Sequence, residues 1–532
     1  MLPIFHVQWL KLLVIIFFVK VLAERSRISE RALEPDQDAF AGKEHCPKWL
    51  VLQSVLAKLG ISEPTPHLGG RIIWNGCEVE GIKLARHKSI NGTLDAAIGK
   101  LQTLRELDLA DTEVSGDVMN LKGLTQLQEL YLFNTNIRGD LSSLQRLTRL
   151  QKVNLRHTKV QGDMASLEGL TQLQGLSLST TKVSGDLASV QGLTQLQRLF
   201  LYDTQIGGDV ASLRGLVQLQ HLWLHTSHIT GDLASLRGFT QLKELHLYNT
   251  KISGDLGTLQ NLTQVNELHL ANTSVAGDFT ALLPWNNVTA IDLEYTQVTG
   301  RLSSEWRGRW SKLRSLKLSN SQVEFLPRPD ELQELQSSFF TSSYPEFSSN
   351  VILPQLNLLA LNGCPLDGDV SDLLPPLCGC PALATIEAAD CGLSGTLPSL
   401  RLKGAAVDGV AWPEWHSLLA QSLKLLNLGT NNITEIRDVT KEMQVLVLAE
   451  NSALKFGDGV LKKALTTGTF LDLQNVALSN TAEAAELLKD GSIQKTEKVS
   501  SMSVEGGYEC HSLVSSKLQV SPEKFLPQEL CK

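Results

Sequence analysis

The residues best suited to chemistry in this 532-residue chain are aromatic and histidine side chains that alternate with leucines. Exposed aromatic residues on a rigid surface commonly anchor protein and peptide ligands. The candidate ligand-binding residues are Tyr131, Phe133, Arg198, Phe200, Tyr202, His221, Trp223, His225, His246, Tyr248 and His269. They concentrate between residues 198 and 269, and that stretch is the first place to expect a partner.

Other roles for these side chains are also open. The rings could simply stack on one another and help to hold a sheet together. His246 and His269 occupy equivalent positions, but we expect no metal site, because no carboxylate or cysteine is expected to complete the set with them. Histidines with an ordinary pKa gain charge on acidification, so a pH-dependent interface is a further hypothesis.

A repeated segment carries all of these residues. Eight copies of a 23-residue sequence run from Leu101 to about Phe279, and the second reads LTQLQELYLFNTNIRGDLSSLQR from Leu124. A period of 20 to 29 residues with L-x-x-L-x-x-L-x-L is typical of leucine-rich repeats. We therefore predict an α/β repeat solenoid, a leucine-rich-repeat horseshoe or superhelix with a parallel concave sheet and a cap at each end. Alternation along each strand should bury Leu130 and expose Glu129 and Tyr131.

Two columns of polar residues recur at fixed positions of the repeat. One column holds Thr or Ser, and its buried hydroxyls are expected to bond the backbone of neighbouring turns: Thr112, Thr135, Thr158, Thr181, Thr204, Ser227, Thr250, Thr273, Thr296 and Ser321. The other column holds aspartates: Asp117, Asp140, Asp163, Asp186, Asp209, Asp232, Asp255 and Asp278. Each aspartate is expected to cap the turn that follows it; the alternative, a row of bound cations, would have only one carboxylate per repeat.

The segment before the repeats resembles part of a known protein family. It contains an amphipathic stretch from Cys46, then Trp74 and Cys77, and then the sequence INGTLDAAIGKLQTLRELDL. This order resembles the N-terminal cap and first repeat of plant-type extracellular leucine-rich-repeat proteins. The resemblance covers residues 46–300 well and 310–480 loosely; Thr replaces the family's Asn, and Gly-Asp-Leu replaces its G-x-I-P. It implies binding of peptides, hormones, other proteins or enzymes associated with wall polysaccharide. Many members also carry a membrane helix and a kinase, and this chain shows neither.

The expected organisation has six parts. They are a signal peptide or anchor (1–23), a linker (24–45), an N-terminal cap with a first repeat (46–100), eight regular repeats (101–284), irregular repeats (285–481) with a loop insertion at 327–350, and a C-terminal cap (482–532). A separate small module at 490–532 is the alternative for that last region.

The cysteines divide into two groups. In an exported protein the economical pairings are Cys46–Cys77 and Cys510–Cys531. Cys364 and Cys391 share the threonine position, so they are expected to be buried thiols. Cys378 and Cys380 lie in a proline-rich loop and have no assigned role.

The N-terminus favours export. The segment has the order of a secretory signal: first Lys11, then the apolar run 12–19, and then small residues near Ala23. Sequons at Asn91, Asn261, Asn272, Asn287 and Asn432 add weak support. We therefore expect a secreted protein, or one that the N-terminal segment anchors to a membrane.

Composition and motifs exclude several classes of function. A net charge of −8 argues against a nucleic-acid partner. The absence of G-x-G-x-x-G, H-E-x-x-H and G-x-S-x-G motifs argues against an enzyme, and no cofactor is expected. The expected function is receptor-like recognition of a protein or peptide on the concave face; the alternative is an architectural wall or matrix protein without a specific ligand.

Overall fold

The computed structural model describes residues 43–61, 68, 70–87, 89–301, 309–324, 353–377, 380–397, 406–407, 410–411, 419, 421–452, 454–457, 459–467, 469–473 and 476. The predicted signal segment, the insertion at 327–350, the C-terminal region 482–532, Cys378 and the Cys510–Cys531 pair lie outside these residues. The chain divides into two compact units, residues 1–183 and 184–532. That boundary falls inside the regular repeats.

The first unit begins with a cap. Helix α2 (Pro47–Lys58) starts with a proline, which the first turn of a helix tolerates well. Strands β1 (Ile72–Asn75) and β2 (Glu78–Lys83) pair antiparallel. The helix buries Trp49 and Leu52, so its apolar face covers the first leucine layer.

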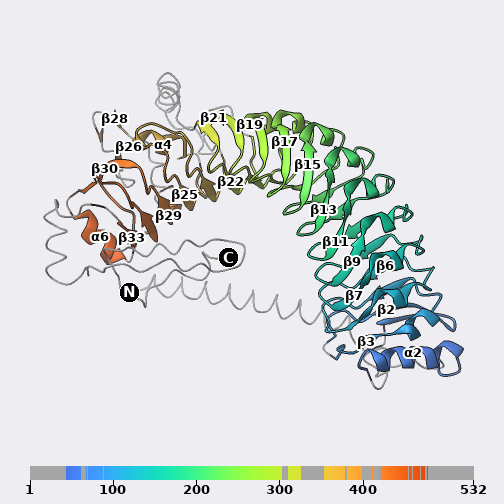
Figure 1. The fold of residues 1–532 in the computed structure, drawn as a ribbon. Helices are drawn as coiled ribbons and strands as arrows, with labels where there is room; N and C mark the ends of the chain where they lie inside the picture. The colour runs from blue at the N-terminus through green and yellow to red at the C-terminus, as the bar shows by residue number, and fades with distance from the viewer. Residues whose placement is uncertain are drawn as a thin grey trace. The chain divides into compact units, whose positions relative to one another are not determined.

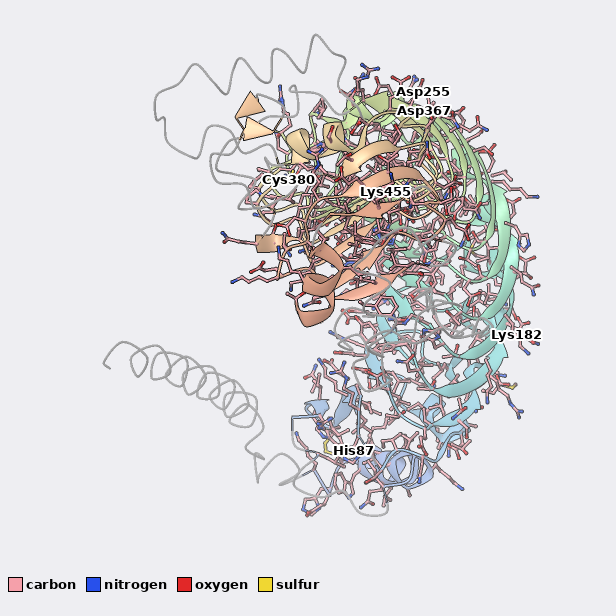
Figure 2. The ribbon with its side chains drawn as sticks, turned by 90° about the vertical axis from the view of Figure 1, so that its left-hand side faces the viewer. His87, Lys182, Asp255, Asp367, Cys380 and Lys455 are labelled. Carbon is pink, nitrogen blue, oxygen red and sulfur yellow. A yellow bond between two sulfur atoms is a disulfide. The ribbon has the colours of Figure 1, made fainter. Side chains whose placement is uncertain are left out.

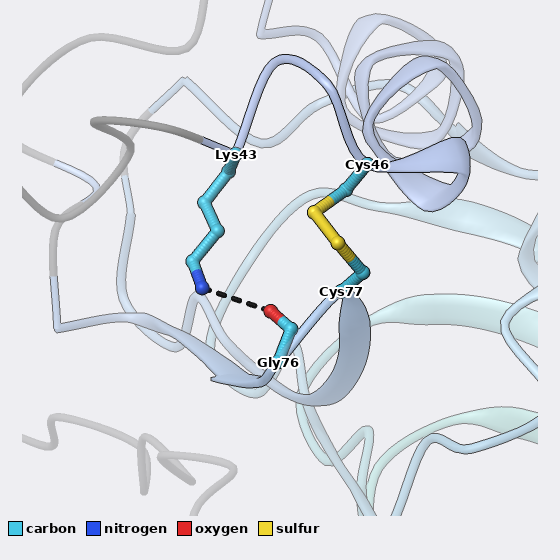
Figure 3. Close-up of a disulfide and its surroundings, with 4 residues drawn as sticks. All are labelled: Lys43, Cys46, Gly76 and Cys77. Atoms are coloured by element: carbon cyan, nitrogen blue, oxygen red, sulfur yellow. Dashed lines mark hydrogen bonds between the residues drawn. A yellow bond between two sulfur atoms is a disulfide. The ribbon is translucent and has the colours of Figure 1, made fainter.

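A disulfide ties this cap together. Cys46, at the start of α2, is joined to Cys77 in the turn between β1 and β2, which confirms the predicted pair (Figure 3). Beside it, Lys43 Nζ donates to the carbonyl of Gly76 over 2.8 Å. Lys43 therefore contacts the cap, although the sequence analysis placed it in the linker.

The regular repeats of the first unit form two parallel ladders. The major ladder continues from β2 through β4 (Glu106–Asp108), β6 (Glu129–Tyr131), β8 (Lys152–Asn154) and β10 (Gly175–Ser177). The second ladder holds β3 (Thr93–Leu94), β5 (Ser115–Asp117), β7 (Asn136–Asp140) and β9 (Lys159–Asp163). Short 3-10 helices follow: η2 (Ala96–Lys100), η3 (Val118–Leu121), η4 (Leu141–Leu144) and η5 (Met164–Leu167).

The second unit repeats this arrangement (Figure 1). Its major ladder is β12 (Arg198–Phe200), β14 (His221–Trp223), β16 (Glu244–His246), β18 (Glu267–His269), β20 (Ala290–Asp292) and β22 (Ser315–Lys317). Its second ladder is β11 (Lys182–Asp186, across the boundary), β13 (Gln205–Asp209), β15 (His228–Asp232), β17 (Lys251–Asp255), β19 (Ser274–Asp278), β21 (Gln297–Arg301) and β23 (Gln322–Glu324). The 3-10 helices are η6 (Leu187–Val190), η7 (Val210–Leu213), η8 (Leu233–Leu236), η9 (Leu256–Leu259) and η10 (Phe279–Leu282).

The irregular repeats extend the major ladder. Strand β22 pairs directly with β24 (Leu358–Ala360), although the predicted insertion separates the two strands in the sequence. The ladder therefore continues from β22 to β24. It then runs through β25 (Thr385–Glu387), β29 (Leu425–Asn427), β31 (Val445–Val447) and β33 (Phe470–Asp472). The other elements of this part are α4 (Val370–Leu377), β26 (Ser394–Leu397), β27 (Ala406–Val407), β28 (Val410–Ala411), β30 (Asn432–Ile436), β32 (Lys455–Phe456) and α6 (Val460–Thr467).

The core follows the predicted alternation. Leu130, Leu132, Ile137 and Leu141 are fully buried, and Tyr131 between the first two is part-exposed. Equivalent leucines are buried in every regular repeat, and each contributes about 1.5–3 kcal/mol by leaving water. The repeats are thus held by leucines stacked along the array, and the exposed strand positions are left free for other roles.

The threonine column forms buried hydrogen bonds, as expected, but each hydroxyl bonds to a carbonyl of its own turn. In Thr112, Thr135, Thr158, Thr181, Thr204, Thr250, Thr273 and Thr296 the hydroxyl donates to the carbonyl three residues earlier, over 2.5–2.7 Å. The bond therefore closes the residue's own turn and not that of a neighbouring repeat. The residue before each of these threonines has φ of 53–55°, so each turn contains a left-handed position, which carries Asp, Asn, His, Thr or Tyr.

The aspartate column confirms the capping prediction. All eight carboxylates accept from the amide two residues on, over 2.6–2.9 Å, as Asp255, labelled in Figure 2, does from Gly257. A glycine of the following repeat lies against most of them: a Cβ on Gly231 would come 2.3 Å from Asp209 Oδ1. Each such glycine therefore leaves room for the aspartate side chain of the preceding repeat.

Cys364 and Cys391 are buried free thiols, as predicted from their position. Their sulfurs donate to the carbonyls of Leu318 and Leu361 in the preceding repeat, over 3.1 and 3.0 Å. Burial raises the pKa of Cys391, and also that of the buried Cys380 (labelled in Figure 2), to about 12. Within the described ranges, no helix is both long and apolar enough to cross a bilayer.

Candidate functional site

The structure places the candidate residues of the second unit on the exposed side of the major ladder. In β12, β14, β16 and β18 the central leucine is fully buried, and the residues on either side of it point away from the core. Parallel pairing then aligns equivalent positions of successive strands. The period-two prediction of which side chains are exposed is confirmed for these strands.

One column of rings runs across four strands. Phe200 lies opposite Trp223, Trp223 opposite His246, and His246 opposite His269. Consecutive ring centroids are 4.8, 4.7 and 4.4 Å apart, and the planes of Trp223 and His246 are within 6° of parallel. These distances are those of favourable aromatic contacts.

A second column lies beside the first, just after the strands. His225 is sandwiched between Tyr202 and Tyr248, with centroid distances of 4.4 and 4.2 Å and interplanar angles of 9° and 16°. Only 9% of His225 is exposed, whereas both tyrosines are part-exposed. Together the two columns form what we call the aromatic face: Phe200, Tyr202, Trp223, His225, His246, Tyr248 and His269.

The rings make the contacts that the structural alternative expects. They do pack on one another along the ladder, and that contact stabilises neighbouring repeats. Most of these rings remain part-exposed after stacking and are accessible to a partner. Binding of a partner by these rings stays a prediction.

Carboxylates border the aromatic face, and the sequence analysis did not assign them a role. Glu244 Oε2 accepts from Trp223 Nε1 over 3.1 Å and lies 3.0 Å from His221 Nδ1. Asp292 lies 3.8 Å from both His269 Nδ1 and Lys317 Nζ. Glu244, in the first position of β16, thus reaches rings of β14, whereas Asp292, in the last position of β20, lies beside a ring of β18.

The electrostatics of two histidines differ from the sequence-based hypothesis. Burial, with the neighbouring His246 and His269, lowers the pKa of His225 to about 3. Burial also lowers the pKa of His246, although the Glu267 carboxylate opposes this shift. Both shifts reduce the charge that these two residues gain on acidification, because stacked rings have displaced the water that would solvate the cation.

His246, Glu267 and His269 come together. Each offers one possible metal-ligand atom, and these atoms all lie within 4.8 Å of one another. The expectation that no carboxylate would complete this set is wrong. That expectation compared only residues at the same position of the repeat. Glu267 is two residues from His269 on the same strand face, and it reaches His246 diagonally, with Oε2 3.6 Å from His246 Nε2.

Tyr131 and Phe133 belong to the first unit. The Tyr131 hydroxyl donates to Glu129 over 2.8 Å, and Lys152 contacts the same carboxylate. The Arg156 guanidinium lies 5.6 Å from the Phe133 ring centroid. Tyr131 thus belongs to a polar cluster with Glu129 and Lys152, and Phe133 makes a separate contact with a cation.

The five sequon asparagines occupy different surroundings. Asn91, Asn261, Asn272 and Asn432 are exposed, and Asn287 is half-buried. Asn272 Nδ2 donates to Asn249 Oδ1 over 2.9 Å, so a sugar there would replace this bond. Glycosylation itself stays a prediction.

Comparison with known proteins shows the fold but no sequence family. No protein-family model and no curated protein matches the chain. Solved structures do match, and the architecture they share with this chain is the leucine-rich-repeat solenoid.

Three of these structures are plant receptor ectodomains. The leucine-rich-repeat ectodomain of the Arabidopsis thaliana receptor kinase GASSHO1/SCHENGEN3, in complex with CASPARIAN STRIP INTEGRITY FACTOR 2, matches at a TM-score of 0.61 and 20% identity, over 80% of this chain and 50% of its own. The plant peptide hormone receptor RGFR1 with RGF2 gives 0.58 and 19%, over 76% and 68%. The Arabidopsis HAESA ectodomain with an IDA peptide hormone gives 0.54 and 18%, over 83% and 78%. The chain thus spans about half the length of the first of these ectodomains.

Proposed function

We propose that this chain is an extracellular, receptor-like leucine-rich-repeat protein that binds a protein or peptide on its aromatic face. The observation that carries the proposal is a continuous array of part-exposed rings on a rigid parallel ladder. Aromatic side chains lose little conformational entropy on binding and supply large contact areas. The matched plant ectodomains are in complex with peptides, which supports the same class of ligand here.

The border of the face suggests the chemistry of the ligand. Glu244, Glu267 and Asp292 present carboxylates beside the rings, and their side chains are 21%, 40% and 15% exposed. A ligand with an apolar or aromatic segment next to a basic residue would complement this surface. Arg198, at the other edge of the face, would favour an acidic group at that end.

The test is a capture experiment with matched variants. The full chain is collected from culture medium, where its N-terminus is expected near Glu24, and is immobilised to capture proteins and peptides from extracellular extract. In the double variant Trp223→Ala/Tyr202→Ala, capture should fall by at least 30-fold, since a central aromatic anchor contributes about 2 kcal/mol. The control is Tyr295→Asn, because Tyr295 is 61% exposed but lies outside the aromatic face.

The stacked rings also favour the second candidate, an architectural protein without a specific ligand. In that case the double variant would unfold at a lower temperature, and the same molecules would be captured by the native chain and by both variants. Equal capture would overturn the binding proposal.

A further inference from the structure

We propose that His246, Glu267 and His269 bind a divalent transition-metal ion, and that Zn²⁺ fits them best. Two imidazoles and one carboxylate make up the set, with candidate ligand atoms within 4.8 Å of one another. Zn²⁺ is commonly held by such a set of three with a fourth position left open. Ca²⁺ and Mg²⁺ prefer oxygen ligands, so the two imidazoles disfavour them.

The distances leave only a small adjustment to make. Bonds of 2.0–2.1 Å in tetrahedral geometry place ligand atoms about 3.4 Å apart. The Glu267 side chain is 40% exposed and can rotate to close the gap, whereas His246 and His269 are 12% and 26% exposed. Two fixed imidazoles and one adjustable carboxylate thus surround the proposed ion.

One of these ligand atoms makes no hydrogen bond within the protein. His246 Nε2 is buried and makes no hydrogen bond, because its distance of 3.6 Å to Glu267 Oε2 is too long for one. A buried nitrogen that makes no hydrogen bond is unfavourable. A metal ion between the two residues would satisfy both atoms.

The surroundings hold the two imidazoles in place. The Trp223 indole stacks on His246 with centroids 4.7 Å apart, and His246 and His269 are paired residues of adjacent strands. Asp292 lies 3.8 Å from His269 Nδ1, beyond hydrogen-bond distance, and places a negative charge beside the site.

The test uses Zn²⁺ alone, so it does not depend on the proposed protein or peptide ligand. The full chain, without a polyhistidine tag and stripped with a chelator, is titrated with Zn²⁺ by calorimetry and with Co²⁺ by visible absorption, which reports tetrahedral coordination. His246→Gln and His269→Gln should each weaken one bound equivalent by at least about 100-fold, since even residues that only orient a ligand contribute 10–100-fold. Glu267→Gln keeps the shape of its side chain and should weaken the same equivalent, so the result does not rest on a histidine variant that fails to fold.

His221→Gln is the matched control, because His221 lies on the same face but pairs with Glu244 outside the set. Its Zn²⁺ affinity should equal that of the native chain. The proposal is overturned if the native chain binds no more Zn²⁺ than the three variants do. It is also overturned if His221→Gln weakens binding as much as His246→Gln.

Discussion

Gly231→Ala is expected to destabilise the protein by about 1.5–4 kcal/mol. Gly231 has φ of +117°, and an added Cβ would lie 2.3 Å from Asp209 Oδ1 and 2.9 Å from Val210 Cγ1. Forcing a residue with a Cβ into that backbone region costs about 1–2 kcal/mol. Displacing the Asp209 carboxylate from its hydrogen bond to the Ala211 amide adds about 0.5–2 kcal/mol.

The same repeat supplies the control. A Cβ on Gly238 would meet nothing within 4 Å, and Gly238 has no positive φ. Gly238→Ala should be neutral, or should stabilise by about 0.4–1 kcal/mol by restricting the unfolded chain. Urea unfolding followed by circular dichroism compares the variants, and hydrogen exchange should show faster exchange of the Ala211 amide in Gly231→Ala alone. Equal stability of the two variants would refute the proposed contact between neighbouring repeats.

Two further predictions concern a buried imidazole and a buried hydroxyl. His225 takes up a proton in the unfolded chain below about pH 6.5 but in the folded chain only near pH 3, so its contribution destabilises the fold progressively as the pH falls between these values. From pH 7 to pH 5 this costs about 2 kcal/mol, and urea midpoints of His225→Phe should lack that part of the pH dependence; an unchanged slope would contradict it. Thr204→Val should cost about 1–3 kcal/mol in unfolding free energy by removing the hydroxyl bond to the Leu201 carbonyl, whereas Thr204→Ser keeps the donor and should cost much less.

Sequence alone was sufficient for the fold because the repeat makes local and global signals agree. The buried Leu130 and its counterparts recur at one position, so the alternation around any one of them gives the exposed residues of every regular strand. The aspartate caps and the buried Cys364 and Cys391 could be predicted for the same reason, since a residue's position in the repeat determines its surroundings.

The candidate site was harder to predict because it depends on residues at different positions of the repeat. Glu267 reaches His246 diagonally between strands, which a comparison of equivalent positions does not detect. The lowered pKa of His225 depends on how deeply two tyrosine rings cover it, and sequence does not give that depth. The left-handed turn position was not predicted either, because residues as different as Asn134 and Tyr295 occupy it.

The contact between aspartate and glycine has a consequence for how such a chain can change in length. Gly231 belongs with Asp209, and Gly254 with Asp232, so the matching residues always lie in consecutive copies. Duplication or loss of one complete 23-residue copy leaves every such pair intact, whereas an insertion of one residue separates a carboxylate from its glycine. Recombination between copies can therefore lengthen or shorten the array in whole steps, while the exposed side chains of each copy remain free to diverge.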